Sequence, residues 1–315
     1  MGLPLAGGPL CFAEVDVLDR ASGVRRISAG ELPDDVRHAL TAPRRLPAGL
    51  PQGRPAVMGI LNLTPDSFSD GGRLGDDAAM AAAVAKMATD GADIIDLGAE
   101  STRPGAAAVD LTQERARLVP VLPLMGSRRW SIDTRKAAIM GDALAAGAAI
   151  VNDVSALTFD AGAAAMLAGQ DCHIVLMHHQ GTPETMQVAP RYDDALLDCY
   201  DWLEGRIAAV VAAGIARDRL IIDPGIGFGK ALAHNVAILR GLPLLHGLGL
   251  PILLGASRKA LISGLAGPAA PGDRLGGSLA LALHGADCGV QILRVHDVPE
   301  TRQALALWSA LRAGG

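Results

Sequence analysis

The chain has 315 residues, half of them hydrophobic, and a net charge of −5 at pH 7. A negative net charge argues against a protein that coats nucleic acid or an anionic membrane. No uncharged apolar stretch reaches the ~20 residues of a membrane span, and the N-terminus lacks the basic segment of a signal peptide. The four cysteines form no CxxC pair. We therefore expect a cytoplasmic protein with free, buried thiols.

Residues 1–54 lack any regular alternation of strand and helix patterns. A stretch dense in proline and arginine, PRRLPAGLPQGRP at 43–55, joins them to the rest of the chain. We expect these 54 residues to form an N-terminal extension that packs beside or under a single domain made by residues 55–315.

Eight short apolar runs follow residue 55, and each leads into a polar or charged residue. The runs are AVMGIL before Asn62, DIIDLG before Glu100, WSI before Asp133, AAIV before Asn152, HIVLM before His178, LII before Asp223, PILLGA before Ser257 and QIL before Arg294. Helical patterns are expected near residues 76–90, 112–125, 135–147, 160–169, 192–214, 233–247, 273–287 and 298–312. Strands whose C-terminal ends carry polar residues, repeated eight times, are typical of a (β/α)8 TIM barrel.

An open, doubly wound α/β sheet is the alternative architecture. The segment GIGFG at 225–229 follows a predicted strand, as a dinucleotide-binding loop would. It lacks the GxGxxG spacing and opens no immediate helix. The sequence therefore favours the barrel.

Two long polar segments follow the first two predicted strands. The first, NLTPDSFSDGG at 62–72, contains one large aromatic residue, Phe68. It is either an ordinary loop of turn-forming residues or a lid that closes over a ligand. The second, ESTRPG at 100–105, is either a helix-capping turn or part of the same binding site.

Three hydrogen-bond acceptors, Asp133, Asn152 and Asp223, end the third, fourth and sixth strands. A carboxylate at a barrel mouth is costly to desolvate unless something binds it. Together the three suit a flat heterocycle with adjacent N–H donors. Binding of a hard cation and capping of the following helices remain alternatives.

Positive charge gathers after the last two strands. Lys259 follows the seventh strand, and Arg294 and His296 lie two residues apart on the eighth, so that they share one face. Loops after strands 7 and 8 of such barrels frequently bind phosphate. We expect an anion at this position.

Several of these segments together closely resemble the dihydropteroate synthase family. They are NLTPDSFSDGG, DLGAESTRPGA, SIDTRKA, IVNDVSA, LMHHQGTPETMQ, IIDPGIGFGK, LLGASRKALI and RVHDV, which cover about residues 56–313. The resemblance implies an enzyme that joins 4-aminobenzoate to (7,8-dihydropterin-6-yl)methyl diphosphate and releases 7,8-dihydropteroate and pyrophosphate.

The resemblance also implies roles for individual residues. The pterin and diphosphate would be bound by Thr102, Asp133, Asn152, Met177, Asp223, Phe228, Lys259, Arg294 and His296. The aminobenzoate would be bound by Phe68, Thr102, Arg103, Pro104 and Lys259. Lys259, Arg294, His296 and Asp133 would be catalytic, and Mg²⁺ would lie at Asn62. His178 is given no role.

The same resemblance implies a homodimer and inhibition by sulfonamides, which mimic aminobenzoate. One departure from the family pattern is Ala260, which stands where serine is frequent. A pterin-binding methyltransferase and a non-catalytic pterin-binding paralogue remain alternatives. The methyltransferase has less need of the basic residues around Lys259 and Arg294, and the presence of every diphosphate and loop residue named above disfavours the paralogue.

Overall fold

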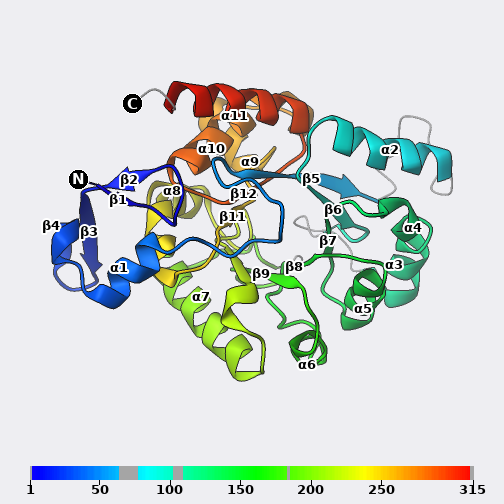
Figure 1. Ribbon diagram of the computed structural model, residues 1–315, viewed down its shortest axis with the longest axis horizontal. Coiled ribbons are helices and arrows are strands. Elements are labelled where there is room, and N and C mark those ends of the chain that lie inside the picture. Colours follow the sequence, from blue (N-terminus) through cyan, green and yellow to red (C-terminus); the bar gives the residue numbers. More distant parts are fainter. Residues whose placement is uncertain (1, 64–76, 102–108, 183–184, 313–315) are drawn as a thin grey trace.

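The computed structural model describes residues 2–63, 77–101, 109–182 and 185–312. Eight parallel strands form its centre, with a ring of helices around them (Figure 1). The strands are β5 (Ala56–Asn62), β6 (Ile94–Gly98), β7 (Trp130–Asp133), β8 (Ile150–Asp153), β9 (His173–Met177), β10 (Leu220–Asp223), β11 (Leu253–Leu254) and β12 (Ile292–Val295). All eight predicted strands are confirmed.

The strands lie side by side in the order β10-β9-β8-β7-β6-β5-β12-β11. The two ends of this row meet where Ile222 of β10 bridges Ile252, just before β11. The Ile222 amide donates a 2.9 Å hydrogen bond to the Pro251 carbonyl there. Because the sheet closes on itself, the predicted barrel is confirmed and the open-sheet alternative is wrong.

Most of the predicted helices are present. The helices are α1 (Asp34–Thr41), α2 (Asp77–Thr89), α3 (Leu111–Leu118), α4 (Leu122–Met125), α5 (Ala137–Ala145), α6 (Ala163–Ala168), α7 (Ala195–Ala212), α8 (Leu232–Arg240), α9 (Ala260–Ala266), α10 (Leu275–Asp287) and α11 (Val298–Arg312). Gly91, Gly147 and Gly214 follow α2, α5 and α7 with positive φ, as residues that end helices commonly do.

Three helix predictions need correction. The helix predicted at 112–125 is divided into α3 and α4, because Pro120 has no N–H to continue the first helix. The helix predicted at 233–247 ends at Arg240, and a 3₁₀ segment, η4 (Leu242–Leu248), follows with Pro243 near its start. The short helix α9 was not predicted, because its seven residues directly follow Lys259 and include a glycine.

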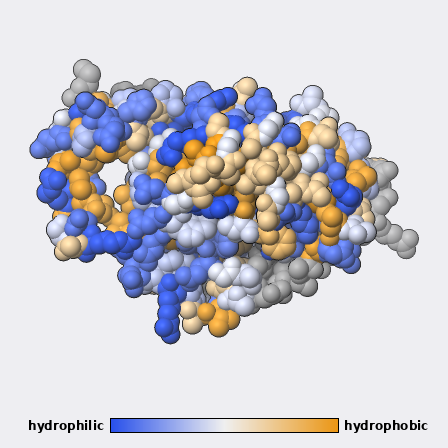
Figure 2. All heavy atoms as spheres, turned by 90° about the horizontal axis from the view of Figure 1, so that it is seen from below, coloured by the Kyte–Doolittle hydropathy of each residue, from blue (hydrophilic) through white to orange (hydrophobic). Residues whose placement is uncertain are grey.

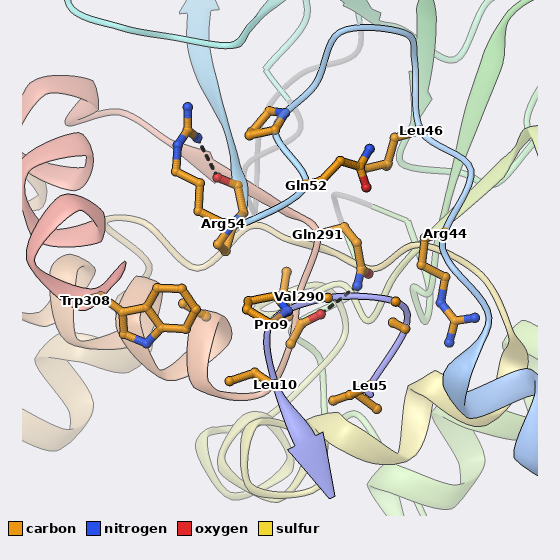
Figure 3. Close-up of a pocket in the computed structure, with 17 residues that line it drawn as sticks. Leu5, Pro9, Leu10, Arg44, Leu46, Gln52, Arg54, Val290, Gln291 and Trp308 are labelled. Carbon is orange, nitrogen blue, oxygen red and sulfur yellow. Dashed lines mark hydrogen bonds between the residues drawn. The ribbon is translucent and has the colours of Figure 1, made fainter. Parts of the chain in front are cut away.

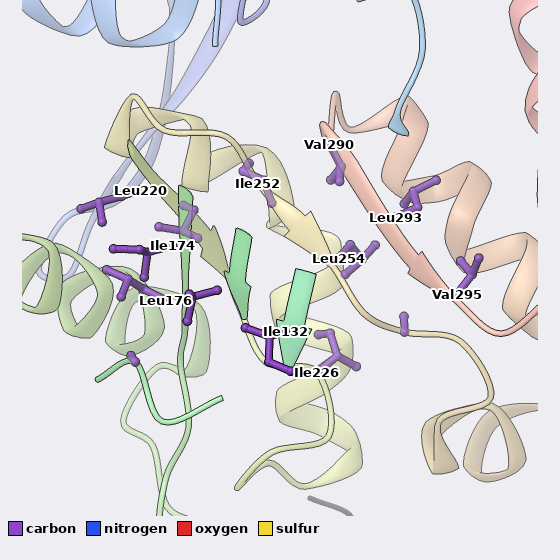
Figure 4. Packing of buried hydrophobic residues seen from close by; sticks show 14 of the residues in the cluster. Ile132, Ile174, Leu176, Leu220, Ile226, Ile252, Leu254, Val290, Leu293 and Val295 are labelled. Atoms are coloured by element: carbon purple, nitrogen blue, oxygen red, sulfur yellow. The ribbon is translucent and has the colours of Figure 1, made fainter. Parts of the chain in front are cut away.

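Strand side chains alternate between the barrel interior and the layer beneath the helices. The interior is a small apolar cluster from the first residues of the strands, including Met58, Ile94, Ile150 and Ile221. The outward side chains form the larger core, which Figure 4 shows around Leu176, Leu254 and Leu293. Since side chains two residues apart share a face, the next inward position on each strand lies near its C-terminal end.

The N-terminal residues form two small antiparallel sheets and one helix. β1 (Leu3–Pro4) pairs with β2 (Cys11–Phe12), and β3 (Glu14–Asp19) pairs with β4 (Gly23–Ser28). The β3–β4 hairpin is largely exposed. Figure 1 places this hairpin at the left of the molecule, and the surface in Figure 2 is hollowed on the same side. Its turn is tied to α7 by Arg20, which lies 2.9 Å from Asp198. All four cysteines are free, but Cys11 is exposed, so the prediction of four buried thiols is wrong for this one.

A pocket of about 50 Å³ lies between the N-terminal residues and the last two helices (Figure 3). Its lining includes Arg44, Gln52, Gln291 and Trp308. Gln291 directly precedes β12, so the pocket is at the N-terminal end of the barrel, where residues of this fold serve stability. The Arg44 guanidinium donates hydrogen bonds to the carbonyls of Ala39, Ala42 and His246, so its role in the pocket is structural.

No helix in the described part of the chain is both long enough and apolar enough to span a bilayer.

Candidate active site at the barrel mouth

The C-terminal ends of the barrel strands, which we call the barrel mouth, bring the predicted polar residues together. Asn152, Asp223 and Arg294 each lie two residues beyond an apolar residue of the interior cluster, and Asp133 lies two residues beyond Ser131. The strand alternation therefore aims all four into the barrel. Asp133, Asn152, Met177 and Asp223 are all at least nine-tenths buried there. The predicted convergence of the three acceptors on one cavity is consistent with this placement.

Arg294 joins two carboxylates at the centre of the mouth. Its Nη2 donates to Asp133 Oδ2 at 2.7 Å, and its Nε donates to Asp96 Oδ2 at 2.6 Å. Arg294 is therefore a bridge between two acids as well as a candidate anion ligand. Such charge-assisted bonds fix the guanidinium plane.

Asp96 is a site residue that the sequence reasoning did not identify. It is fully buried in β6 and also accepts hydrogen bonds from Ser131 Oγ and, at 3.1 Å, from Asn152 Nδ2. One signal was available: the second aspartate of the apolar run DIIDLG shares the inward face of Ile94. Asp96 thus orients both Asn152 and Arg294.

The carboxyl groups of the mouth are poorly solvated. Burial raises the pKa of Asp133 to about 7, against the opposing effect of the Arg294 charge. Burial also raises the pKa of Asp223, whose Oδ1 accepts a 2.7 Å hydrogen bond from the Gly225 amide. Additional N–H donors would stabilise the ionised form of both groups. A ligand edge that presents such donors is therefore complementary to the site.

Lys259 lies over the ring of Phe228, with 4.1 Å between Nζ and the ring centroid. Burial, assisted by the neighbouring Arg294 charge, lowers the pKa of Lys259 to about 8. The lysine is still mostly protonated at neutral pH. It is close enough to Asp223 for that charge to act on its pKa, which places it at the same mouth.

The other basic residues near the mouth differ in their availability. His296 Nδ1 lies 3.1 Å from Ser257 Oγ, and the His296 amide donates to the same oxygen. Arg258 is turned away to Asp297, to which its Nε donates at 3.1 Å. Of the stretch Ser257–Lys259, Lys259 therefore supplies the positive charge to the mouth.

Asn62 ends β5 and is partly exposed. A Cβ placed on Gly98 would lie 3.6 Å from Asn62 Oδ1 and 3.2 Å from Asp133 Cβ, so Asn62 is at the rim beside Asp133. The described residues contain no cluster of three or more His, Cys, Asp or Glu side chains that could hold a metal. One amide oxygen suits a Mg²⁺ ion that keeps its waters and is held mainly by substrate phosphates.

His178, to which the sequence analysis assigns no role, accepts a hydrogen bond from a buried lysine. Its Nδ1 lies 2.7 Å from Lys230 Nζ.

Four of the predicted ligand-binding residues, Phe68, Thr102, Arg103 and Pro104, lie outside the described residues.

Comparison with known proteins agrees with this geometry. The family model for pterin binding enzymes matches residues 58–296. The dihydropteroate synthase of Neisseria meningitidis serogroup B is 49% identical over 268 residues, which cover 82% of this chain and 93% of that protein. The chain thus spans nearly the whole length of that relative.

Solved structures show the same likeness. Xanthomonas albilineans dihydropteroate synthase with 4-aminobenzoic acid matches with a TM-score of 0.78 and 45% identity, covering 83% of this chain and 94% of that one. The Yersinia pestis enzyme with a sulfonamide drug matches with a TM-score of 0.77 and 39% identity, and the match covers 95% of this chain and 100% of that one. The chain belongs to the pterin-binding enzyme family, and within it to the dihydropteroate synthases.

Proposed function

We propose that this chain joins 4-aminobenzoate to (7,8-dihydropterin-6-yl)methyl diphosphate at the barrel mouth. The observation that carries the proposal is the mouth itself: buried acceptors at Asp133, Asn152 and Asp223 lie beside the cations Lys259 and Arg294. The first set suits the N–H edge of a pterin, and the second suits a diphosphate. Membership of the dihydropteroate synthases supports the same reaction.

The pterin ring would lie against the acceptors, with Met177 and Phe228 as apolar contacts. Asp133 and Asp223 would accept N–H hydrogen bonds that compensate the cost of burying their charge. Asn152, whose amide nitrogen already donates to Asp96, would offer its oxygen to the ring. These contacts fix the orientation of the methylene carbon that reacts.

Substitution at that methylene breaks its bond to the diphosphate oxygen and forms a bond to the aminobenzoate nitrogen. The electron pair of the broken bond leaves with pyrophosphate, and the nitrogen then loses a proton to solvent. Arg294 and His296 would stabilise the charge that develops on the leaving group. An aniline nitrogen is nucleophilic near neutral pH, so the site needs no strong base, and positioning supplies much of the remaining rate.

Aminobenzoate would be bound by Lys259 together with Phe68, Thr102, Arg103 and Pro104, four residues that lie outside the described part of the chain. Residue 260 is alanine and has no hydroxyl to offer the aminobenzoate carboxylate. Backbone amides at the start of α9 would assist in binding that carboxylate.

The proposed reaction is tested by pyrophosphate release from the pterin diphosphate, with pure protein, Mg²⁺ and 4-aminobenzoate. We expect release that depends on aminobenzoate and is inhibited by a sulfonamide in competition with it. The Yersinia pestis relative has been solved with such a drug. Absence of release from protein that still binds the pterin diphosphate would reject the synthase reaction in favour of a binding module.

Mg²⁺ would be held by Asn62 and by the substrate diphosphate. When bound, it would neutralise part of the diphosphate charge. Removal of divalent ions with a chelator should therefore abolish turnover, and added Mg²⁺ should restore it. Asn62→Leu should raise the Mg²⁺ concentration needed for half-maximal activity. An unchanged Mg²⁺ requirement in this variant would remove Asn62 from the metal site.

We also propose that the protein is a cytoplasmic homodimer in which residues 55–315 form the pterin-binding domain and residues 1–54 an extension of it. Exposed leucines on the outer helix α11, Leu307 and Leu311, are of the kind that subunit contacts cover. Light scattering on the purified protein should give twice the chain mass of 32.3 kDa. A monomer mass at all concentrations used for the activity assay would contradict the dimer.

A further inference from the structure

Lys230 is a buried cation that the reaction described above does not use. Its side chain is only 2% exposed. It forms no salt bridge with any carboxylate in the described parts of the chain, although burying an ammonium is costly. A buried charge held without a counter-ion has to be balanced by hydrogen bonds.

Those hydrogen bonds all run to one small region behind Phe228. Lys230 Nζ lies 2.7 Å from His178 Nδ1, 2.9 Å from the Gly225 carbonyl and 3.0 Å from the Phe228 carbonyl. The His178 carbonyl is a weaker fourth partner at 3.3 Å. The three N–H groups of the ammonium are therefore directed at the end of β9 and at segment 225–229.

Segment 225–229 has a conformation that needs such a donor. Gly225, Gly227 and Gly229 all have positive φ, and the carbonyls of Gly225 and Phe228 in this turn both accept from Lys230. Buried carbonyls require hydrogen-bond donors, and Lys230 supplies one to two of them. The segment is also tightly packed, since a Cβ on Gly225 would collide with the His178 carbonyl.

His178 is suited to receive the ammonium because it stays uncharged. Burial and the adjacent Lys230 charge lower the pKa of His178 to about 2, so its Nδ1 lone pair accepts while the proton lies on Nε2. The ring is held edge-on to Trp202 at 5.0 Å between centroids. His178 is thus a fixed acceptor that sets the position of Lys230 Nζ.

The pair acts on the mouth through Phe228. Lys230 holds the Phe228 backbone, and the Phe228 ring carries Lys259 Nζ at 4.1 Å. We infer that Lys230 and His178 are positioning residues, which touch no substrate but hold Phe228, and through it Lys259, in the arrangement that binds the pterin. The inference rests on the proposed assignment of Phe228 and Lys259 to the pterin site.

The first test measures the dissociation constant of the pterin diphosphate by calorimetry, in the presence of Mg²⁺ and without aminobenzoate. Lys230→Met should weaken binding by about tenfold, since one tenfold step corresponds to about 1.4 kcal/mol, the scale of one buried hydrogen bond. Lys86→Met, at an exposed lysine on α2, is the matched control and should leave the constant unchanged. Wild-type affinity in folded Lys230→Met would overturn the inference.

A second pair of variants remains informative if Lys230→Met does not fold. His178→Asn keeps an acceptor near the position of Nδ1, whereas His178→Leu removes it and leaves a side chain of similar bulk. We expect His178→Asn to retain affinity within about threefold and His178→Leu to lose about tenfold, the difference being one charge-assisted hydrogen bond. Equal affinities in the two variants would contradict a role through Lys230.

A double-mutant cycle separates positioning from general stability. If Lys230 acts through Phe228, adding Lys230→Met to Phe228→Leu should cause less than about a twofold further loss, because coupled residues are not additive. Effects that simply multiply would refute the inference. If the wild-type protein itself fails to bind the pterin diphosphate, the proposed function is wrong. If the wild type binds and Lys230→Met binds equally well, only the inference about Lys230 is wrong.

Discussion

Arg294→Met is expected to lower kcat/KM for the pterin diphosphate by at least about 10²–10³-fold, the loss seen when a donor to developing negative charge is removed. The side chain has two functions that this change removes together. It would contact the leaving diphosphate, and it bridges Asp96 and Asp133 at 2.6 and 2.7 Å. Without the cation, two buried carboxyls face each other uncompensated, and the pKa of Asp133 should rise above its value of about 7.

The same change should also destabilise the fold, by roughly 3–5 kcal/mol in the free energy of unfolding, because a buried ion pair loses one partner. Arg115→Met is the matched control. Its Arg115–Asp142 pair has the same 2.7 Å separation but is about two-fifths exposed, so we expect a loss of less than about 1 kcal/mol. Denaturant unfolding measures both variants.

Stability and activity can then be separated in the double variant Asp96→Asn with Arg294→Met. Removing the Asp96 charge should recover part of the free energy of unfolding, because one uncompensated carboxylate is gone. It should not recover kcat/KM, because the donor to the diphosphate is still missing. Recovery of both quantities together would mean that Arg294 supports the fold alone.

The sequence was sufficient to predict the barrel and most of its mouth. Each strand is an apolar run that ends at a polar residue, and the two-residue alternation places residues such as Asp133 and Asp223 on the inward face. The break between α3 and α4 could also have been predicted, because Pro120 lies inside the expected helix. These features depend on local pattern alone.

Other features depend on contacts between distant parts of the chain. Asp96 lies within the apolar run DIIDLG, and its importance follows from Arg294, which is 198 residues away in the sequence. The Lys230–His178 contact joins residues 52 apart. Arg258 turns to Asp297 and not to the mouth, which no pattern around SRK indicates. Which polar groups pair inside a barrel is decided by its closure, and that is not encoded locally.

Lys259 should give the pH dependence of the enzyme its alkaline limb. Burial lowers the pKa of this lysine to about 8, so it is charged below that pH and neutral above it. If the ammonium binds substrate, titration of Lys259 should leave kcat/KM unchanged below about pH 8 and should lower it about tenfold for each further pH unit, as loss of a single proton requires. Initial rates between pH 6 and about 10 measure the limb.

Lys259→Arg tests the assignment, because arginine stays protonated over this whole range. The plateau of kcat/KM should fall, since the larger planar guanidinium cannot place its charge where the compact ammonium does, but the alkaline limb should move up by more than about one pH unit. Burial also lowers the pKa of Lys230 to about 8, so this second lysine is the alternative source of the limb. A limb that stays near pH 8 in Lys259→Arg would assign it to Lys230, the other lysine in the described part of the chain whose pKa is lowered to about 8.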